Sequence, residues 1–160
     1  MIRSFFGSAI LLSALLVSTI SFAQTQADKD EQVLKAYFAK NKIKATRTPA
    51  GVYYVVSKKG SGENMKAGQH IAMKYLGTFL DGKRFDGNMD EKFNSKGNPY
   101  SFTLGAGQVI RGWDEGIQHF NTGSRGTIYL PSAMGYGAQG MGPIPPNSVL
   151  VFHIEVVGVQ

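Results

Sequence analysis

Residues that usually carry enzyme chemistry are few in this chain of 160 residues and are not grouped. The three histidines, His70, His119 and His153, are dispersed, and none stands three or four positions from another, so no preformed metal site is indicated. The chain has no cysteine and no G-x-S-x-G motif, which leaves no candidate nucleophile for hydrolysis. Asp81 and Asp86 flank one expected hairpin, but no paired-carboxylate glycosidase geometry follows from them. We therefore expect neither a metal nor a cofactor.

Residues 135–140, Gly-Tyr-Gly-Ala-Gln-Gly, match the glycine pattern of dinucleotide-binding proteins. In such proteins a helix follows at once and presents its N-terminus to the pyrophosphate. Pro143, Pro145 and Pro146 exclude that helix here. The glycines instead suit a turning loop beside a cleft.

Aromatic residues at expected turns and strand ends are the remaining group that could form a site. Taken singly, each is more often part of a hydrophobic core than of a ligand pocket. Taken together they favour contact with a ligand. The group comprises Tyr75, Phe85, Tyr100, Phe102, Trp113, Tyr136 and Phe152.

A short helix is the first element expected to support this group. Residues 28–31, Asp-Lys-Asp-Glu, resemble a capping box, and apolar residues at 33, 34, 37 and 38 recur at helical spacing up to Asn41. The helix either packs on its own domain or pairs with a second copy of the chain. One short helix seldom dimerises stably, which favours the first arrangement. The helix and a linker make up residues 24–48.

Residues 49–160 are expected to form the main domain. Asp81-Gly82 predicts a tight turn that returns the chain through Phe85, and the polar segment 86–99 predicts an exposed loop. β-branched, aromatic and alternating apolar residues predict strands at residues 52–57, 69–79, 100–104, 127–130 and 149–157.

One further helix interrupts the strands. From Val109 the apolar period changes, and Ile110, Trp113, Ile117 and Phe120 fall on one helical face. Many strands, short turns and a single internal helix predict the α+β class, with an antiparallel β-sheet wrapped around one short central α-helix and a short N-terminal helix beside it.

Residues 1–23 are expected to be a cleaved signal peptide. Arg3 precedes an apolar run over residues 5–20, and Ser21-Phe22-Ala23 offers small residues to a signal peptidase before Gln24. A membrane anchor is the alternative, but the run is short for a span and is interrupted by Gly and Ser. We expect an exported protein, periplasmic or secreted, with no stable membrane span after cleavage.

The positive charge of the chain is local. The formal net charge is +6, and residues 24–66 carry nine basic against four acidic side chains, whereas residues 67–160 carry seven of each. A basic segment can contact anionic lipid or nucleic acid. The chain lacks the basic stripe with interleaved aromatics that nucleic-acid binding favours, so a solvated face is the preferred interpretation and no nucleic-acid partner is expected.

Residues 109–116, Val-Ile-Arg-Gly-Trp-Asp-Glu-Gly, closely resemble the signature of the FKBP family of peptidyl-prolyl cis-trans isomerases, and Phe-Thr-Leu-Gly at 102–105 precedes them as in that family. The segment 86–99 looks longer than the corresponding loop of that family. The resemblance covers about residues 50–160. Further blocks follow the family's order at residues 75–77, 81–86, 135–137, 144–147 and 150–152.

The resemblance implies a pocket with Trp113 as its floor, and a polar rim formed by Asp86 and Tyr136. The amide of Ile110 would donate to a carbonyl of a substrate or a macrolide, because N–H groups at the start of a helix lack intrahelical partners. Asp86, Tyr136 and Ile110 are the expected catalytic residues. The walls would be Tyr75, Phe85, Tyr100, Val109, Ile110, Ile144 and Phe152.

The same resemblance implies a prolyl isomerase, or rotamase, that assists the folding of exported proteins. Its expected partners are proline-containing unfolded or folding polypeptides, and macrolides as ligands. The rival interpretation is a non-catalytic binding module or chaperone that uses the same pocket or the basic helix, since a shared fold does not decide function. The retention of all the pocket residues favours the enzyme.

Overall fold

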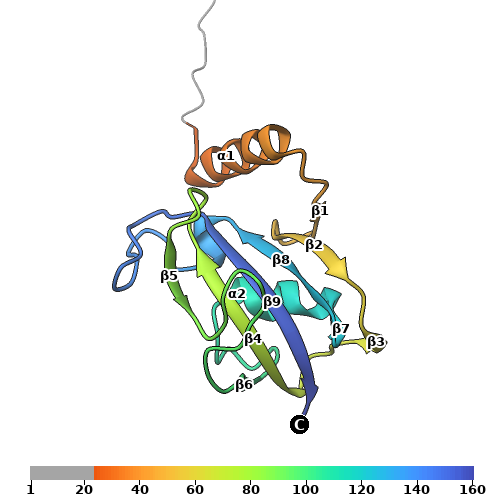
Figure 1. Cartoon of the computed structure of the whole chain (residues 1–160). Helices are drawn as coiled ribbons and strands as arrows, with labels where there is room; N and C mark the ends of the chain where they lie inside the picture. Colours follow the sequence, from red (N-terminus) through yellow and green to blue (C-terminus); the bar gives the residue numbers. More distant parts are fainter. Residues whose placement is uncertain (1–23) are drawn as a thin grey trace, which may run out of the picture.

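The computed structural model describes residues 24–160, and the expected signal peptide at 1–23 lies outside the described residues. It contains two α-helices, two 3-10 turns and nine strands (Figure 1). In chain order these are α1 Gln26–Asn41, β1 Thr46–Arg47, β2 Tyr53–Lys58, β3 Ser61–Asn64, β4 His70–Thr78, β5 Arg84–Gly87, β6 Tyr100–Thr103, α2 Arg111–Gly116, η1 Ile117–His119, β7 Asn121–Thr122, β8 Arg125–Leu130, η2 Ser132–Met134 and β9 Leu150–Val159.

Seven of the strands form one antiparallel sheet. Its order is β1-β2-β8-β9-β4-β5, and β6 pairs with β4 beyond the end of β5. The longest ladder joins β4 to β9, from Ile71 opposite Val159 to Thr78 opposite Val151. β3 and β7 form a separate two-stranded ribbon. The α+β class with an antiparallel sheet, a short central helix and an N-terminal helix is therefore confirmed.

The two helices lie on opposite faces of this sheet, because alternate residues of a strand point to opposite sides. In β8, Ile128 and Leu130 belong to the core around α2, whereas Tyr129 between them packs with α1. In β9, Phe152 faces α2 and Val151 faces α1. Figure 1 shows α1 above the upper end of the sheet and α2 behind β9.

Two glycines bring α2 very close to β8. Gly112 and Gly116 are four residues apart and thus share one face of the helix. A Cβ on Gly112 would overlap the methyl groups of Leu130, and a Cβ on Gly116 would lie 2.8 Å from Ile128 Cδ1. Side chains any larger would hold the helix away from the sheet and shift Trp113, which lies between the two glycines.

The first helix begins earlier than the sequence suggested. The expected capping box at residues 28–31 is wrong: Thr25 is the N-cap, and its side chain and that of Asp28 each accept from the other residue's backbone amide. Threonine is a preferred N-cap residue, so the helix begins after Thr25. Asp28, three residues later, is the acidic residue of the capping box.

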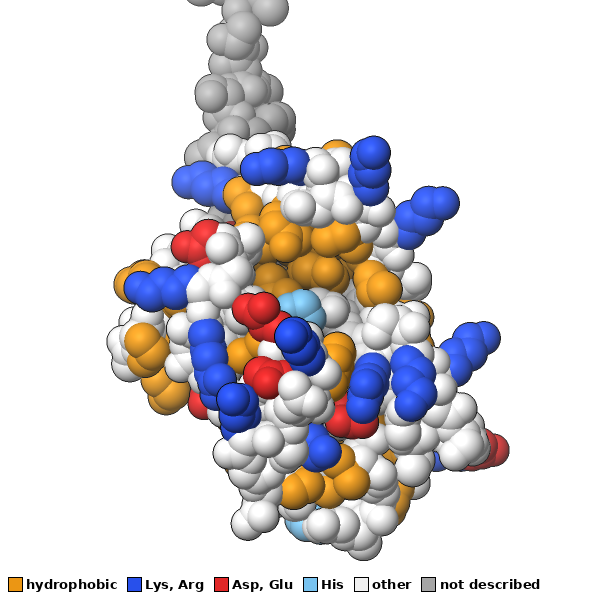
Figure 2. All heavy atoms as spheres, in the orientation of Figure 1, with side chains coloured by type: hydrophobic (Ala, Val, Ile, Leu, Met, Phe, Trp, Pro, Cys, Tyr) orange, Lys and Arg blue, Asp and Glu red, His pale blue; other side chains and the backbone are white. Residues whose placement is uncertain are grey.

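α1 packs on its own domain, the first of the two arrangements that the sequence left open. Phe38 stands edge-on to Tyr129, with 4.9 Å between ring centroids, and lies 5.0 Å from the ring of Tyr53. Leu34 is fully buried beside them. Figure 2 shows apolar side chains extending from α1 over the adjoining sheet surface, with basic side chains around them.

The central helix is shorter than expected. α2 ends at Gly116, and residues up to His119 form a 3-10 turn, because Phe120 is already extended, with φ of −120°, and its amide donates to Ile117. The last strands also differ slightly from expectation: β8 starts at Arg125 and β9 runs from Leu150 to Val159.

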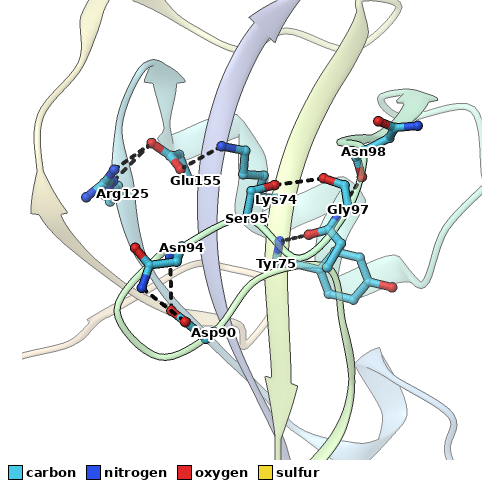
Figure 3. A network of polar contacts seen from close by, with 10 residues as sticks. Lys74, Tyr75, Asp90, Asn94, Ser95, Gly97, Asn98, Arg125 and Glu155 are labelled. Atoms are coloured by element: carbon cyan, nitrogen blue, oxygen red, sulfur yellow. Dashed lines mark hydrogen bonds and ion pairs between the residues drawn. The ribbon is translucent and has the colours of Figure 1, made fainter.

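The segment expected as an exposed loop at 86–99 is in part packed against the sheet. Met89 is fully buried, and the guanidinium of Arg125 lies over the Phe93 ring, 4.9 Å from its centroid. Asp90 accepts from the backbone and the side chain of Asn94, which folds the loop on itself (Figure 3). The sequence shows the polarity of this segment but not the single methionine that anchors it.

Within residues 24–160, no helix combines the length and the apolar character needed to cross a bilayer.

We expect Gly112→Ala to lower the free energy of unfolding by about 1 to 3 kcal/mol, because the added methyl group overpacks the contact with buried Leu130. Urea denaturation measures this change. Gly97→Ala is the matched control, since no atom lies within 4 Å of its added methyl group and its φ is ordinary; it should alter stability by about 0.5 kcal/mol or less. Equal stability of the two variants would show that α2 does not depend on this approach.

Candidate functional site

A cavity of about 440 Å³ opens where β4, β5, β6 and β9 meet the start of α2. Most of its lining is aromatic or aliphatic, with polar groups at the rim. Eight of the ten residues expected from the sequence come together here. The lining residues are Tyr75, Asp86, Tyr100, Gln108, Val109, Ile110, Trp113, Tyr136 and Phe152.

Trp113 forms the floor of this cavity and is only 5% exposed. Tyr75 and Phe152 stand edge-on to its ring, with centroid distances of 4.8 and 5.2 Å. Tyr100 lies edge-on at 6.1 Å and remains 43% exposed, so its ring forms the outer part of the wall. Edge-to-face contacts are a favourable geometry for aromatic pairs, and they fix the floor from three sides.

Phe85 and Ile144, which were expected as wall residues, do not line the cavity. Phe85 packs behind the wall, with its ring 5.6 Å from that of Phe152 and against the Cα of Gly77, where a Cβ would lie 2.6 Å from the Phe85 ring. Ile144 is 6% exposed and belongs to the hydrophobic core. Both residues therefore support the pocket from outside it.

The polar rim is organised around Asp86. The hydroxyl of Tyr75 donates to Asp86 Oδ2 at 2.8 Å, and the amide of Gly87 donates to Oδ1 at 2.7 Å. Burial and the hydrogen bond to Asp86 raise the pKa of Tyr75 well above its ordinary value. Burial, followed by the charge of Asp86, also raises the pKa of Tyr136. Both phenols therefore carry their protons at neutral pH and can act as donors.

A backbone donor completes the rim at Ile110. This residue precedes α2 in an extended conformation, with φ of −59° and ψ of 146°, and its carbonyl accepts from the amide of Trp113 at 2.9 Å. Among residues 24–160, its own amide has no acceptor. The amide is therefore available to a carbonyl group placed in the cavity.

The loop before α2 is held by Asp114. Its carboxylate accepts from the amides of Gly105 at 2.7 Å and Gly107 at 3.2 Å. An acidic side chain in the first turn of a helix is also favoured by the helix dipole. The contacts make Asp114 a brace for the segment that leads to Val109 and Ile110.

Gln108 is the cavity residue that the sequence reasoning missed. Its Oε1 accepts from the amide of Thr103 at 2.8 Å, which ties the lining to β6. Its position directly before the Val-Ile-Arg-Gly-Trp motif is the one signal that could have identified it.

In the part of the chain that the structure describes, no three His, Cys, Asp or Glu side chains are grouped as metal ligands. The cavity itself is lined by groups that can hold an amide. It offers an apolar-lined space for a ring, and the phenol proton of Tyr136 and the free Ile110 amide for carbonyl oxygens.

Comparison with known proteins places this chain in a family. Residues 61–157 match the model of the family described as FKBP-type peptidyl-prolyl cis-trans isomerase. The chain is 38% identical over 145 residues to the FKBP-type peptidyl-prolyl cis-trans isomerase FkpA of Aeromonas hydrophila, which covers 86% of this chain and 51% of that protein. It is 40% identical over 112 residues to a peptidyl-prolyl cis-trans isomerase of Schizosaccharomyces pombe, covering 69% of this chain and 96% of the relative.

Solved structures agree with these relatives. The crystal structure of FkpA from Escherichia coli superposes with a TM-score of 0.68 at 34% identity, over 84% of this chain and 61% of that one. A crystal structure of a peptidyl-prolyl cis-trans isomerase from Pseudomonas syringae gives a TM-score of 0.66 at 27% identity, and the match covers 87% of this chain and 99% of that one. The chain spans about half the length of the Aeromonas relative. On the match of residues 61–157 and the similarity over 96% of the Schizosaccharomyces pombe protein, the chain belongs to the family of FKBP-type peptidyl-prolyl cis-trans isomerases.

Proposed function

We propose that this protein catalyses the rotation of X-Pro peptide bonds in the cavity above Trp113. The observation that carries the proposal is the aromatic pocket whose rim holds two protonated phenols and an unoccupied backbone amide. Membership of the FKBP-type family supports the same activity.

The reaction needs a suitable environment rather than a nucleophile. Rotation of the peptide bond costs roughly 18 to 20 kcal/mol because amide resonance is lost in the twisted state. The twisted carbonyl is less polarised than the planar one, so an apolar pocket disfavours the ground state more than the transition state. Trp113, Tyr75 and Phe152 supply that environment around the proline ring.

Three groups orient the substrate in this proposal. The Ile110 amide and the Tyr136 hydroxyl donate to substrate carbonyls on either side of the proline. Asp86 fixes the hydroxyl of Tyr75 and interacts with the carbonyl that rotates. Each tenfold gain in rate requires the barrier to fall by about 1.4 kcal/mol, which a few such contacts can provide.

The proposed substrates are proline-containing segments of unfolded or folding polypeptides. FK506 is a second proposed ligand of the same cavity, because a relative 37% identical over 134 residues is the FK506-binding protein 4 of Mycosarcoma maydis. That relative is matched over 34% of its own length. FK506 therefore serves below as a competitor that reports whether catalysis occurs in this cavity.

The proposed place of action is outside the cytoplasm. Support comes from the basic residue, apolar run and small residues of positions 1–23. Two similar proteins come from the Gram-negative bacteria Aeromonas hydrophila and Escherichia coli, where a signal peptide directs a protein into the periplasm, so the periplasm is the compartment that we propose. The clients would then be newly exported proteins.

We expect the protein to accelerate cis-to-trans relaxation of a short X-Pro peptide, and FK506 to suppress the acceleration. Tyr136→Phe should lower kcat/KM by about two- to twelvefold, the value of one hydrogen bond. Trp113→Leu should lower it by about tenfold or more, since it removes the aromatic floor. Stopped-flow absorbance at several enzyme concentrations measures these rates.

Tyr37→Phe is the control for these two variants, because Tyr37 packs on Tyr129 at the opposite face of the sheet. It should retain the wild-type rate. A folded wild type that leaves the relaxation rate unchanged would refute the isomerase proposal, and FK506 binding by that protein would then leave the non-catalytic binding module.

Asp86 is tested by a pair of substitutions. Asp86→Ala should lower kcat/KM by about tenfold with folding intact, because Tyr75 loses the acceptor of its hydroxyl. Asp86→Asn retains an acceptor oxygen for Tyr75 but not the negative charge. Comparison of the two variants therefore separates the contribution of the hydrogen bond from that of the charge. Unchanged turnover in Asp86→Ala, with circular dichroism equal to that of the wild type, would exclude Asp86 from the mechanism.

Expression of the full chain in a Gram-negative host tests the proposed export. The periplasmic protein should have the mass of residues 24–160, which mass spectrometry of the intact protein measures. Ala23→Arg places a large charged residue where the peptidase requires a small one, and should leave the precursor uncleaved. Recovery of the wild type with residues 1–23 still attached would contradict the proposed cleavage.

A further inference from the structure

A buried carboxylate joins α1 to the segment that carries Tyr136. Asp30 is 2% exposed, and its Oδ2 accepts from the amide of Ser132 at 2.8 Å and from the Ser132 hydroxyl at 2.6 Å. Its Oδ1 accepts from Nε2 of Gln26 at 2.7 Å. The two bonded residues, Asp30 and Ser132, are 102 positions apart in the chain.

Ser132 in turn holds the backbone on both sides of Tyr136. It opens the 3-10 turn η2, and its carbonyl accepts from the amide of Gly135 at 3.0 Å and from that of Gly137 at 2.8 Å. Tyr136 lies between these two amides, with its ring at the cavity. An unbroken series of hydrogen bonds thus runs from Asp30 through Ser132 to the backbone that presents the Tyr136 hydroxyl.

The helix is also docked by apolar contacts. Leu34 and Phe38 already bury the apolar side of α1 against Tyr53 and Tyr129. Among residues 24–160, no Lys, Arg or His forms an ion pair with Asp30. Burial of a carboxylate without a cation is costly and is tolerated where directed hydrogen bonds satisfy it. The hydrogen bonds of Asp30 therefore fix the position of Ser132 relative to α1.

The segment that Asp30 holds is an irregular loop with a few backbone hydrogen bonds of its own, among them those from Gly140 to Tyr136 and from Asn147 to Gly137. Residues 135–149 connect η2 to the strand β9 without a helix or strand of their own. They contain four glycines, of which Gly137, Gly140 and Gly142 have positive φ. Glycine-rich segments have many accessible conformations, so a fixed anchor at Ser132 narrows the positions open to Tyr136.

We propose that Asp30 is a positioning residue of the isomerase site, which acts through Ser132 on the placement of Tyr136. The inference rests on the proposed function, because it assigns to the Tyr136 hydroxyl the role given above. It extends the functional unit to α1, a helix on the opposite face of the sheet from the cavity floor. Asp30 itself touches no substrate.

A double-mutant cycle tests this coupling. Asp30→Ala should lower kcat/KM by about two- to tenfold in the wild-type background, up to the effect of removing the Tyr136 hydroxyl. In the Tyr136→Phe background the same substitution should have almost no further effect, because the group that it positions is absent. Asp30→Asn keeps one acceptor oxygen toward Ser132 and should restore part of the activity.

Phe38→Leu is the matched control, because it weakens the docking of α1 but leaves Asp30 and Ser132 unchanged. Its loss of stability should not lower kcat/KM, and any effect should be the same in both backgrounds. The positioning role would be overturned if the fold-losses of kcat/KM in Asp30→Ala and Tyr136→Phe multiply in the double variant. It would also be overturned if Phe38→Leu loses as much activity as Asp30→Ala. Asp30 would then have a structural role.

Amide hydrogen exchange separates this inference from the proposed function, because it needs no activity. Asp30→Ala should accelerate exchange at Gly135 and Gly137 by about tenfold or more, whereas Phe38→Leu should not do so selectively. If the wild type proves inactive on peptides but shows this change, the proposed function fails and the coupling of Asp30 to the Tyr136 backbone stands. Unchanged exchange at both glycines in a folded Asp30→Ala protein would refute the coupling itself.

Discussion

The close approach of α2 to β8 is the contact on which the rest of the molecule depends. Gly112 and Gly116 allow the helix to lie directly on Leu130 and Ile128, and this depth places Trp113 at the bottom of a cavity instead of in its mouth. The strands around the helix then supply the walls, since Tyr75 and Phe152 stand edge-on to the Trp113 ring. A helix held further out would close the cavity with its own side chains.

The same strands serve two cores. In β9, Phe152 is a wall of the cavity and Val151 packs with α1, and in β8 Tyr129 contacts α1 between two residues that contact α2. Because the side-chain period of a strand is two, neither face can change register without moving the other. α1 therefore stabilises the outer face of a sheet whose inner face is the site.

Much of this arrangement follows from the sequence, and the exceptions have physical causes. The cavity is predicted by the resemblance of the motif around Trp113, and of the order of the aromatic blocks, to the FKBP family. Phe85 and Ile144 share the chemistry of wall residues, and only packing decides that they lie behind the wall. Asp30 and Ser132 are 102 positions apart, and no local pattern indicates that they meet.

Two carboxylates away from the substrate hold the two sides of the cavity in the same way. Asp114 accepts from two amides of the loop that leads to Ile110, and Asp30 accepts from two donors of the residue that anchors the Tyr136 segment. Each of the proposed carbonyl donors is thus carried by a glycine-containing loop that a carboxylate fixes. Rotation of a peptide bond requires no strong acid or base. The protein can therefore raise the rate of rotation by holding hydrogen-bond donors in place before the substrate binds. Fixed loops are the means by which a small sheet without a metal-ligand cluster among its described residues can achieve that placement.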